Sequence, residues 1–133
     1  MLSYNTLLEL IKQSVENTPS LLSIPIGLSF ETAISEFAHV GFRLPRQSGK
    51  STVARELHHN TSSLLYTRYG PNGFNLYNEE VKFRGRRFYG MKLEYIILDE
   101  FSTIPLELVY FIYSILLPAG LIHKNFRIVS LYT

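Results

Sequence analysis

A tetrapeptide, Gly49-Lys50-Ser51-Thr52, constrains the fold of this chain more than any other feature. It follows the apolar run 39–42 and a short loop, and it leads into a helical pattern over 52–59. This order suits phosphate binding, because glycine lets backbone N–H groups approach a phosphate and a helix N-terminus favours negative charge. The lysine then reaches the β- and γ-phosphates, and the serine hydroxyl binds magnesium. We therefore expect ATP and Mg²⁺ as ligands, with ATP contacts from Arg46, Gln47, Ser48, Gly49, Lys50, Ser51 and Thr52.

The loop departs from the usual pattern G-x-x-x-x-G-K-[ST], because Leu44 stands where the first glycine belongs. A bare Gly-Lys-Ser is common by chance, so a second element has to support it. The run 93–98 is an apolar strand, and it ends in Asp99 and Glu100. In nucleoside triphosphatases such an aspartate holds the magnesium shell, and the glutamate polarises the attacking water. The two elements predict a P-loop NTPase core, with Ser51 and Asp99 at the metal and Glu100 catalytic.

Composition limits the class of protein. The 133 residues suffice for one domain with a real core, and 46% hydrophobic against 18% charged residues indicate a globular chain. A net charge of +2 is too small to indicate nucleic-acid binding by itself, and the absence of cysteine excludes a disulfide framework and thiolate metal sites. The start lacks a signal-peptide pattern, and the most apolar stretch is short for a bilayer. We expect a soluble, cytoplasmic protein without a membrane partner, in the host cytoplasm or with a virion or procapsid if the chain is viral.

We expect one domain over 1–133, made of an N-terminal helical cover (1–38) and a nucleotide-binding core (39–133). Apolar spacing predicts an amphipathic helix over 3–17, and Ser29 is placed to cap a second, short helix. Both helices are expected to pack on one face of the sheet. The alternative is that they cover the nucleotide or meet a partner.

The core is predicted to be a three-layer α/β/α sandwich with a mainly parallel sheet. The strand 126–131 is expected between the strands 39–44 and 94–99, as the Asp-Glu signature implies. Another strand is predicted at 62–68, and 74–81 is predicted to form a short edge strand.

Polar and apolar features near the C-terminus suggest further contacts. A helix over 106–117, capped by Ser102 or Thr103 with a proline in its first turn, is apolar nearly all round, so it is expected to be buried or to meet a partner. Ser130 and Thr133, at the end of the last strand, are candidates to sense the γ-phosphate.

The stretch 82–90 concentrates basic residues among aromatic ones, including Arg84, Arg86 and Arg87. Such a segment favours contact with a nucleic-acid backbone, with rings stacking on bases. It would also suit contact with the γ-phosphate of a neighbouring subunit. The alternative is a solvated loop before the acidic strand.

The run 44–54 resembles the variant phosphate-binding loop of tailed-phage large terminases, the motors that pump DNA into procapsids. In that family an arginine stands four residues before the lysine, as Arg46 does here, and the first glycine is often missing. Its Arg-Gly pair is similar to Arg84-Gly85, and its Asp-Glu pair is similar to Asp99-Glu100. The resemblance covers about 40–133 and implies ATP hydrolysis coupled to movement on double-stranded DNA, with Arg46 as a catalytic arginine finger in cis.

The chain also departs from that family. Large terminases carry a nuclease domain built on clustered aspartates, whereas the single aspartate here is already assigned to the metal, so we expect no nuclease activity. The chain ends where the family's polar coupling motif and fifth core strand would follow. We therefore expect a minimal or incomplete core, completed at its sheet edge by another copy or another protein, or a remnant that turns over slowly.

Three functions remain open at this point. The first is a terminase-like ATPase acting on or with viral nucleic acid. The second is a nucleoside or nucleotide kinase; thymidine kinases are similar in their Gly-Lys-Ser/Thr and Asp-Glu motifs, but their zinc-binding cysteines are missing here. The third is a nucleotide-binding structural or regulatory module with little turnover. The motifs favour the first.

Overall fold

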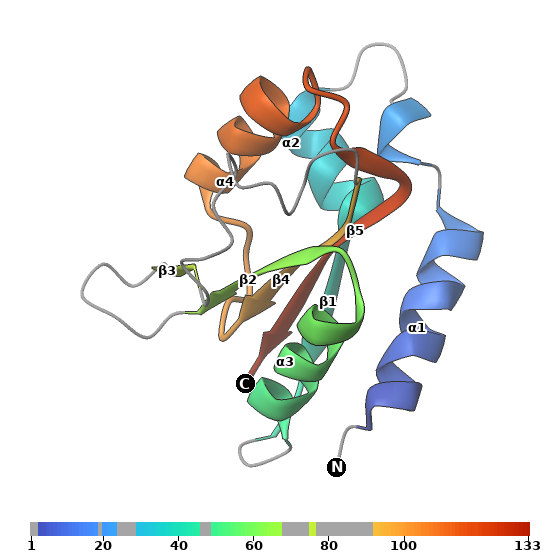
Figure 1. Cartoon of the computed structure of the whole chain (residues 1–133), viewed down its shortest axis with the longest axis vertical. Coiled ribbons are helices and arrows are strands. Elements are labelled where there is room, and N and C mark those ends of the chain that lie inside the picture. The colour runs from blue at the N-terminus through green and yellow to red at the C-terminus, as the bar shows by residue number, and fades with distance from the viewer. Residues whose placement is uncertain (1–2, 19, 24–28, 46–48, 68–74, 77–91) are drawn as a thin grey trace.

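A five-stranded sheet in the order β1-β5-β4-β2-β3 runs through the molecule (Figure 1). The computed structural model describes residues 3–18, 20–23, 29–45, 49–67, 75–76 and 92–133. The strands are β1 (His39–Arg43), β2 (Ser63–Thr67), β3 (Asn75–Leu76), β4 (Leu93–Asp99) and β5 (Ile122–Tyr132). β1, β5, β4 and β2 pair in parallel, and β3 adds a short antiparallel edge. An α/β fold with a mainly parallel sheet is therefore confirmed.

The position of β5 between β1 and β4 confirms the strand order expected from the sequence. Gly41 of β1 pairs with Ser130 of β5, and Ile97 of β4 pairs with Val129. Because the four strands are parallel, their carboxyl ends share one edge of the sheet. Ligands of such sheets bind at that edge.

One face of the sheet is covered by α1 (Tyr4–Asn17) and α3 (Lys50–Asn60). The start of α1 is fixed by the backbone N–H of Thr6, which donates to Ser3 Oγ at 3.1 Å. Apolar residues of both helices form one buried cluster with the inward residues of β2, β4 and β5: Leu7, Ile11, Val53, Ala54, Leu57, Leu65, Ile97, Val129 and Leu131. This cluster seats the start of α3 against the sheet.

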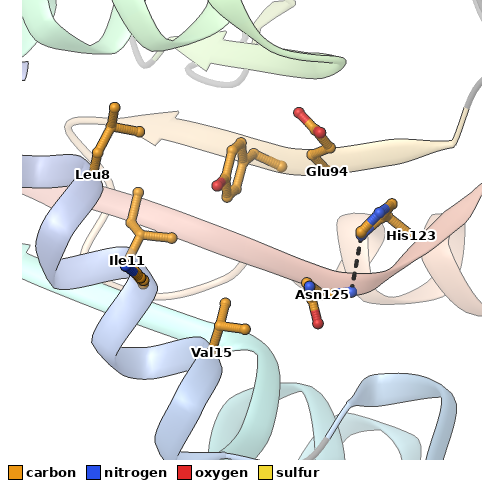
Figure 2. Close-up of a pocket in the computed structure, with 8 residues that line it drawn as sticks. Leu8, Ile11, Val15, Glu94, His123 and Asn125 are labelled. Carbon is orange, nitrogen blue, oxygen red and sulfur yellow. Dashed lines mark hydrogen bonds between the residues drawn. The ribbon is translucent and has the colours of Figure 1, made fainter.

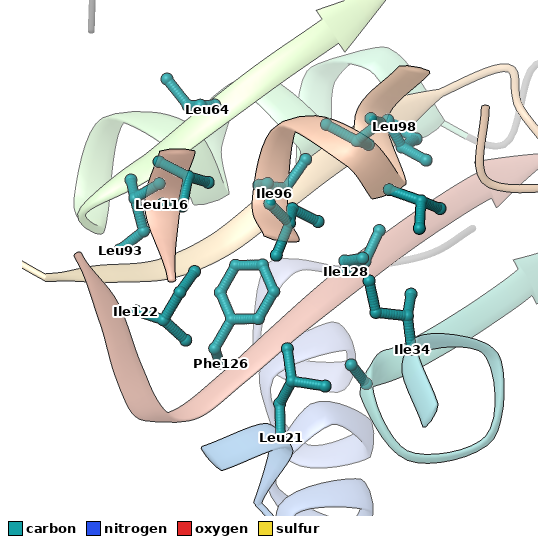
Figure 3. Close-up of a cluster of buried hydrophobic side chains, with 14 of the residues drawn as sticks. Leu21, Ile34, Leu64, Leu93, Ile96, Leu98, Leu116, Ile122, Phe126 and Ile128 are labelled. Carbon is teal, nitrogen blue, oxygen red and sulfur yellow. The ribbon is translucent and has the colours of Figure 1, made fainter. Parts of the chain in front are cut away.

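The other face is covered by α2 (Phe30–Ala33) with the π-helix η2 (Ile34–Ala38), and by α4 (Leu106–Phe111) with the π-helix η4 (Ile112–Leu116). The short 3₁₀ helix η1 (Leu21–Ser23) adds Leu21 to the same core. Figure 3 shows Phe126 of β5 within this cluster, beside Leu21 and Ile128. The backbone N–H of Thr32 donates to Ser29 Oγ at 3.2 Å, so the predicted cap of α2 is confirmed.

Two local predictions are wrong. The N-terminal helices α1 and α2 lie on opposite faces of the sheet, because the apolar side chains of each belong to a different core cluster. Helix α4 begins directly after Pro105 and has no side-chain cap, so neither Ser102 nor Thr103 plays that part.

The α4–η4 segment is buried on one side only. Leu108, Ile112 and Leu116 face the core, whereas Tyr110 is 60% exposed and Tyr113 is also exposed. The segment ends at a turn where the N–H of Gly120 donates to the carbonyl of Leu117 at 3.1 Å. Among the described helices, none is long and apolar enough to cross a membrane.

Candidate functional site

Gly49 is the residue that precedes α3, and its backbone conformation allows the helix to begin at Lys50. Its φ of 84° lies in the left-handed region, which glycine enters at little cost because it has no Cβ. Its carbonyl accepts the N–H of Val53 at 2.9 Å and so begins the helix. The N–H groups of the first turn then point towards the carboxyl edge of the sheet, where they favour an anion.

Lys50 and Glu100 form an ion pair at this edge. The distance from Lys50 Nζ to Glu100 Oε1 is 2.8 Å, and the side chains are 8% and 22% exposed. Glu100 follows β4 with a φ of 72°, a conformation that costs a non-glycine residue about 1–2 kcal/mol. Its N–H donates to the carbonyl of Leu131 at 2.7 Å, which holds the turn in place. The strained residue is thus the predicted catalytic one.

Ser51 and Asp99 form the second pair of the site. The hydroxyl of Ser51 donates to Asp99 Oδ2 at 2.8 Å. Asp99 is 4% exposed, and its Oδ1 has no hydrogen-bond partner within the described residues. Burial raises the pKa of Asp99, while the hydrogen bond from Ser51 and the charge of Lys50 oppose that rise and the charge of Glu100 adds to it.

This pair fits magnesium in the chemistry of its donors. Mg²⁺ prefers oxygen ligands, and in nucleotide sites it uses one or two protein groups together with phosphates and water. A serine hydroxyl beside a buried carboxylate oxygen without a partner provides such a set. In the described ranges no group of three or more His, Cys, Asp or Glu side chains could hold a metal by itself. The pair suits a nucleotide-bound ion better than an all-protein cage.

The two candidate γ-phosphate sensors lie in different surroundings. Thr133 Oγ1 donates to Glu100 Oε2 at 3.4 Å, which places it beside the ion pair. Ser130 is fully buried, and its hydroxyl lies 2.7 Å from His39 Nε2. Burial lowers the pKa of His39, which favours the neutral ring. No sequence motif pointed to His39, because its partner belongs to a strand 91 residues later.

The other predicted site residues lie partly within and partly outside the described residues. Thr52 is exposed in the first turn of α3. The remaining predicted ATP contacts and the predicted nucleic-acid contacts lie outside the described residues: Arg46, Gln47, Ser48, Arg84, Arg86 and Arg87. The structure therefore brings together Gly49, Lys50, Ser51, Asp99 and Glu100 from the predicted set.

A cleft of about 290 Å³ is lined in part by Ser102, which lies two residues after Glu100 in the sequence. Its walls come from α2, η2, β1, α4 and the segment before α4, and they are mostly polar: Glu31, Ser35, His39, Ser102, Thr103, Ile104 and Val109. Its hydroxyl groups, from Ser35, Ser102 and Thr103, suit a small polar molecule.

A second cleft, of about 230 Å³, opens at the other end of the sheet between α1 and the starts of β4 and β5 (Figure 2). Leu8, Ile11 and Val15 project into it from α1. The strands contribute polar groups, among them His123, whose Nδ1 accepts the N–H of Asn125 at 3.0 Å. This cleft shares no residue with the Lys50–Glu100 site.

No model of a known protein family matches the chain, and no curated protein or solved structure is similar enough to be identified as a relative. Function is therefore inferred from the chemistry of the site.

Proposed function

We propose that the chain binds ATP with magnesium at the start of α3 and hydrolyses it to ADP and phosphate. One observation carries this proposal: Lys50, Ser51, Asp99 and Glu100 meet at the carboxyl edge of a parallel sheet, in the pairs Lys50–Glu100 and Ser51–Asp99. A cation, a hydroxyl and two carboxylates beside a helix N-terminus supply the groups that phosphoryl transfer requires.

Each group has a distinct task in binding. The N–H groups of the first turn of α3 hold the phosphates, and Lys50 neutralises their charge. Ser51 and Asp99 would hold the magnesium ion. The bound ion supplies positive charge that offsets the charge developing on the phosphate oxygens.

Glu100 serves the hydrolytic step. Its carboxylate orients a water molecule and accepts a proton from it as the water oxygen bonds to the γ-phosphorus. The bond between that phosphorus and the bridging oxygen breaks, and its electron pair leaves with ADP. Thr133, 3.4 Å from Glu100 Oε2, keeps the carboxylate in position.

The nucleic-acid partner is the second part of the proposal. The resemblance of 44–54 to terminase loops favours double-stranded DNA, with Arg46 acting on the phosphates in cis and the segment containing Arg84 to Arg87 contacting DNA or a neighbour. β1 lies at one edge of the described sheet, so another copy or a viral protein would have a strand to pair with there. The setting would be the cytoplasm of a host cell or an assembling procapsid.

A phosphotransferase is the second candidate function, favoured by the cleft that contains Ser102 and Thr103. Ser102 follows Glu100 by two residues, and in a kinase Glu100 would take the proton of an acceptor alcohol in place of that of water. Phosphate release should be measured with duplex DNA added and, separately, with a mixture of nucleosides. Faster release with DNA supports the ATPase, whereas phosphorylated nucleosides without release support the kinase.

The first test is the substitution Lys50→Ala. Magnesium and ATP at a hundredfold excess over the dissociation constant should raise the free energy of unfolding of the native chain by about 2.7 kcal/mol. The variant should lose this gain, because its site has no cation to meet the phosphates. Thermal melting with and without nucleotide measures the effect.

Lys92→Ala is the matched control. Lys92 is exposed and precedes β4, at the end of the sheet away from the site. It should keep the full gain in stability. Equal gains in Lys50→Ala and in the native protein would show that ATP, if bound, does not use this loop.

A further inference from the structure

The Lys50–Glu100 ion pair has a consequence for which nucleotide the site prefers. Resting on the proposed function, we propose that the Glu100 carboxylate takes the place of a γ-phosphate at Lys50, and that it thereby lowers the affinity of the site for triphosphate while leaving the affinity for diphosphate unchanged. Glu100 would then determine specificity as well as activate water.

Lys50 already has an anionic partner before any nucleotide binds. Its ammonium lies 2.8 Å from Glu100 Oε1, and only 8% of the Lys50 side chain is exposed. Water therefore screens the attraction between the two charges only weakly. The neighbouring carboxylate, Asp99, is engaged by the hydroxyl of Ser51 instead. Within the described residues, Glu100 is the group that an incoming phosphate has to displace.

Glu100 is held in this place from several sides. Its backbone is fixed in the left-handed region by the hydrogen bond to the carbonyl of Leu131. One carboxylate oxygen meets Lys50, and the other accepts the hydroxyl of Thr133 at 3.4 Å. The carboxylate is thus positioned before any nucleotide arrives, and moving it has a cost.

The charge of Glu100 opposes the binding of a γ-phosphate. A γ-phosphate beside Lys50 lies next to the carboxylate, and two anions that share one cation repel each other. The triphosphate therefore binds by breaking the ion pair, which releases Glu100 to meet water. A diphosphate has no γ-phosphate to bring beside Glu100, so the carboxylate stays at Lys50. After hydrolysis and loss of phosphate, Glu100 returns to Lys50.

The experiment compares the binding of two nucleotides. Dissociation constants for the non-hydrolysable β,γ-imido analogue of ATP and for ADP, each with magnesium, are measured by calorimetry in native protein and in Glu100→Gln. Glutamine keeps the shape but removes the charge that competes for Lys50. We expect the triphosphate analogue to bind on the order of tenfold more tightly to the variant, and ADP to change by less than about twofold.

Two further variants serve as a control and as a second test. Glu56→Gln removes an exposed charge from α3 and should leave both dissociation constants unchanged. Glu100→Asn is the second test variant, because asparagine tolerates the left-handed backbone and keeps the fold if glutamine does not. It should show the same gain for the triphosphate analogue.

The outcomes are distinct. Equal gains for both nucleotides, or no gain for the analogue, would overturn the selectivity proposed for Glu100 while leaving ATP binding in place. Failure of native protein and of every variant to bind either nucleotide would overturn the proposed function itself.

Discussion

Two buried cations, Lys50 and Arg127, are held in opposite ways. Lys50, at the carboxyl edge of the sheet, is paired with a carboxylate that is partly exposed. Arg127, on β5, is 1% exposed, and within the described residues it donates to neutral oxygens: the carbonyl of Phe126 and the hydroxyl of Thr18, each at 2.7 Å, and the carbonyl of Thr18 at 3.4 Å. Lys50 therefore has an anionic partner at the edge of the sheet, whereas Arg127 is enclosed among neutral groups of the described residues.

The contrast distinguishes a residue of the candidate site from a residue that holds a helix against the sheet. Arg127 pairs across the sheet with Tyr95, near the starts of β4 and β5, and it ties the residue that ends α1 to the sheet. Burial lowers the pKa of Arg127, but a guanidinium stays charged, so its charge is retained without a counter-ion among the described residues. We interpret Arg127 as a structural residue and Lys50 as a functional one.

The largest expected effect tests that interpretation at Arg127. Arg127→Ala should lower the free energy of unfolding by about 3 kcal/mol, because it leaves a cavity and frees the end of α1. Arg127→Met fills the same space without a charge to desolvate and should stay within about 1 kcal/mol of the native protein. Urea titration measures both. Nucleotide affinity should not change in either variant, and a loss of affinity in Arg127→Met would mean that the charge acts at the site.

The same contrast shows what the sequence could and could not reveal. The Asp-Glu signature predicted the strand order, and the loop and strand motifs predicted that Lys50 and Glu100 belong to one site, because each motif lies within one strand or helix start. They assigned these two residues to different ligands and missed that they bind each other. Arg127 was unrecognised within an apolar strand, because its partner Thr18 is 109 residues away. Helical periodicity showed which side of α1 is buried, but not which face of the sheet this helix covers.

A smaller effect is expected from the second carboxylate of the site. Burial raises the pKa of Asp99 above its ordinary value of 3.8, so the folded protein holds this proton more tightly than the unfolded chain. The stability contributed by Asp99 is therefore present at low pH and falls as pH rises from 3.8 through the folded pKa. Asp99→Asn removes the buried charge and can still accept the hydroxyl of Ser51.

At pH 7 we expect Asp99→Asn to melt at a higher temperature than the native protein, and the difference should shrink as pH falls towards 3. Melting curves across that range measure it. Magnesium-dependent nucleotide binding should weaken in the same variant, so stability and binding should move in opposite directions. A variant that is less stable than the native protein at pH 7 would show that the buried charge of Asp99 does not destabilise the fold.

The smallest expected effect compares two glycines with left-handed backbones, Gly49 at the start of α3 and Gly120 in the turn before β5. A Cβ added to Gly120 would have no atom within 4 Å, so Gly120→Ala reports the backbone cost alone, about 1 kcal/mol of unfolding free energy. Gly49→Ala should carry a similar backbone cost and, in addition, weaken ATP binding, because it alters the turn that aims the first N–H groups of α3. Urea titration and calorimetry on both variants separate the two effects. If Gly120→Ala weakened ATP binding as much as Gly49→Ala, the loss would stem from general destabilisation. The proposed contrast between a functional site at the carboxyl edge of the sheet and a structural role for the opposite edge would then be wrong.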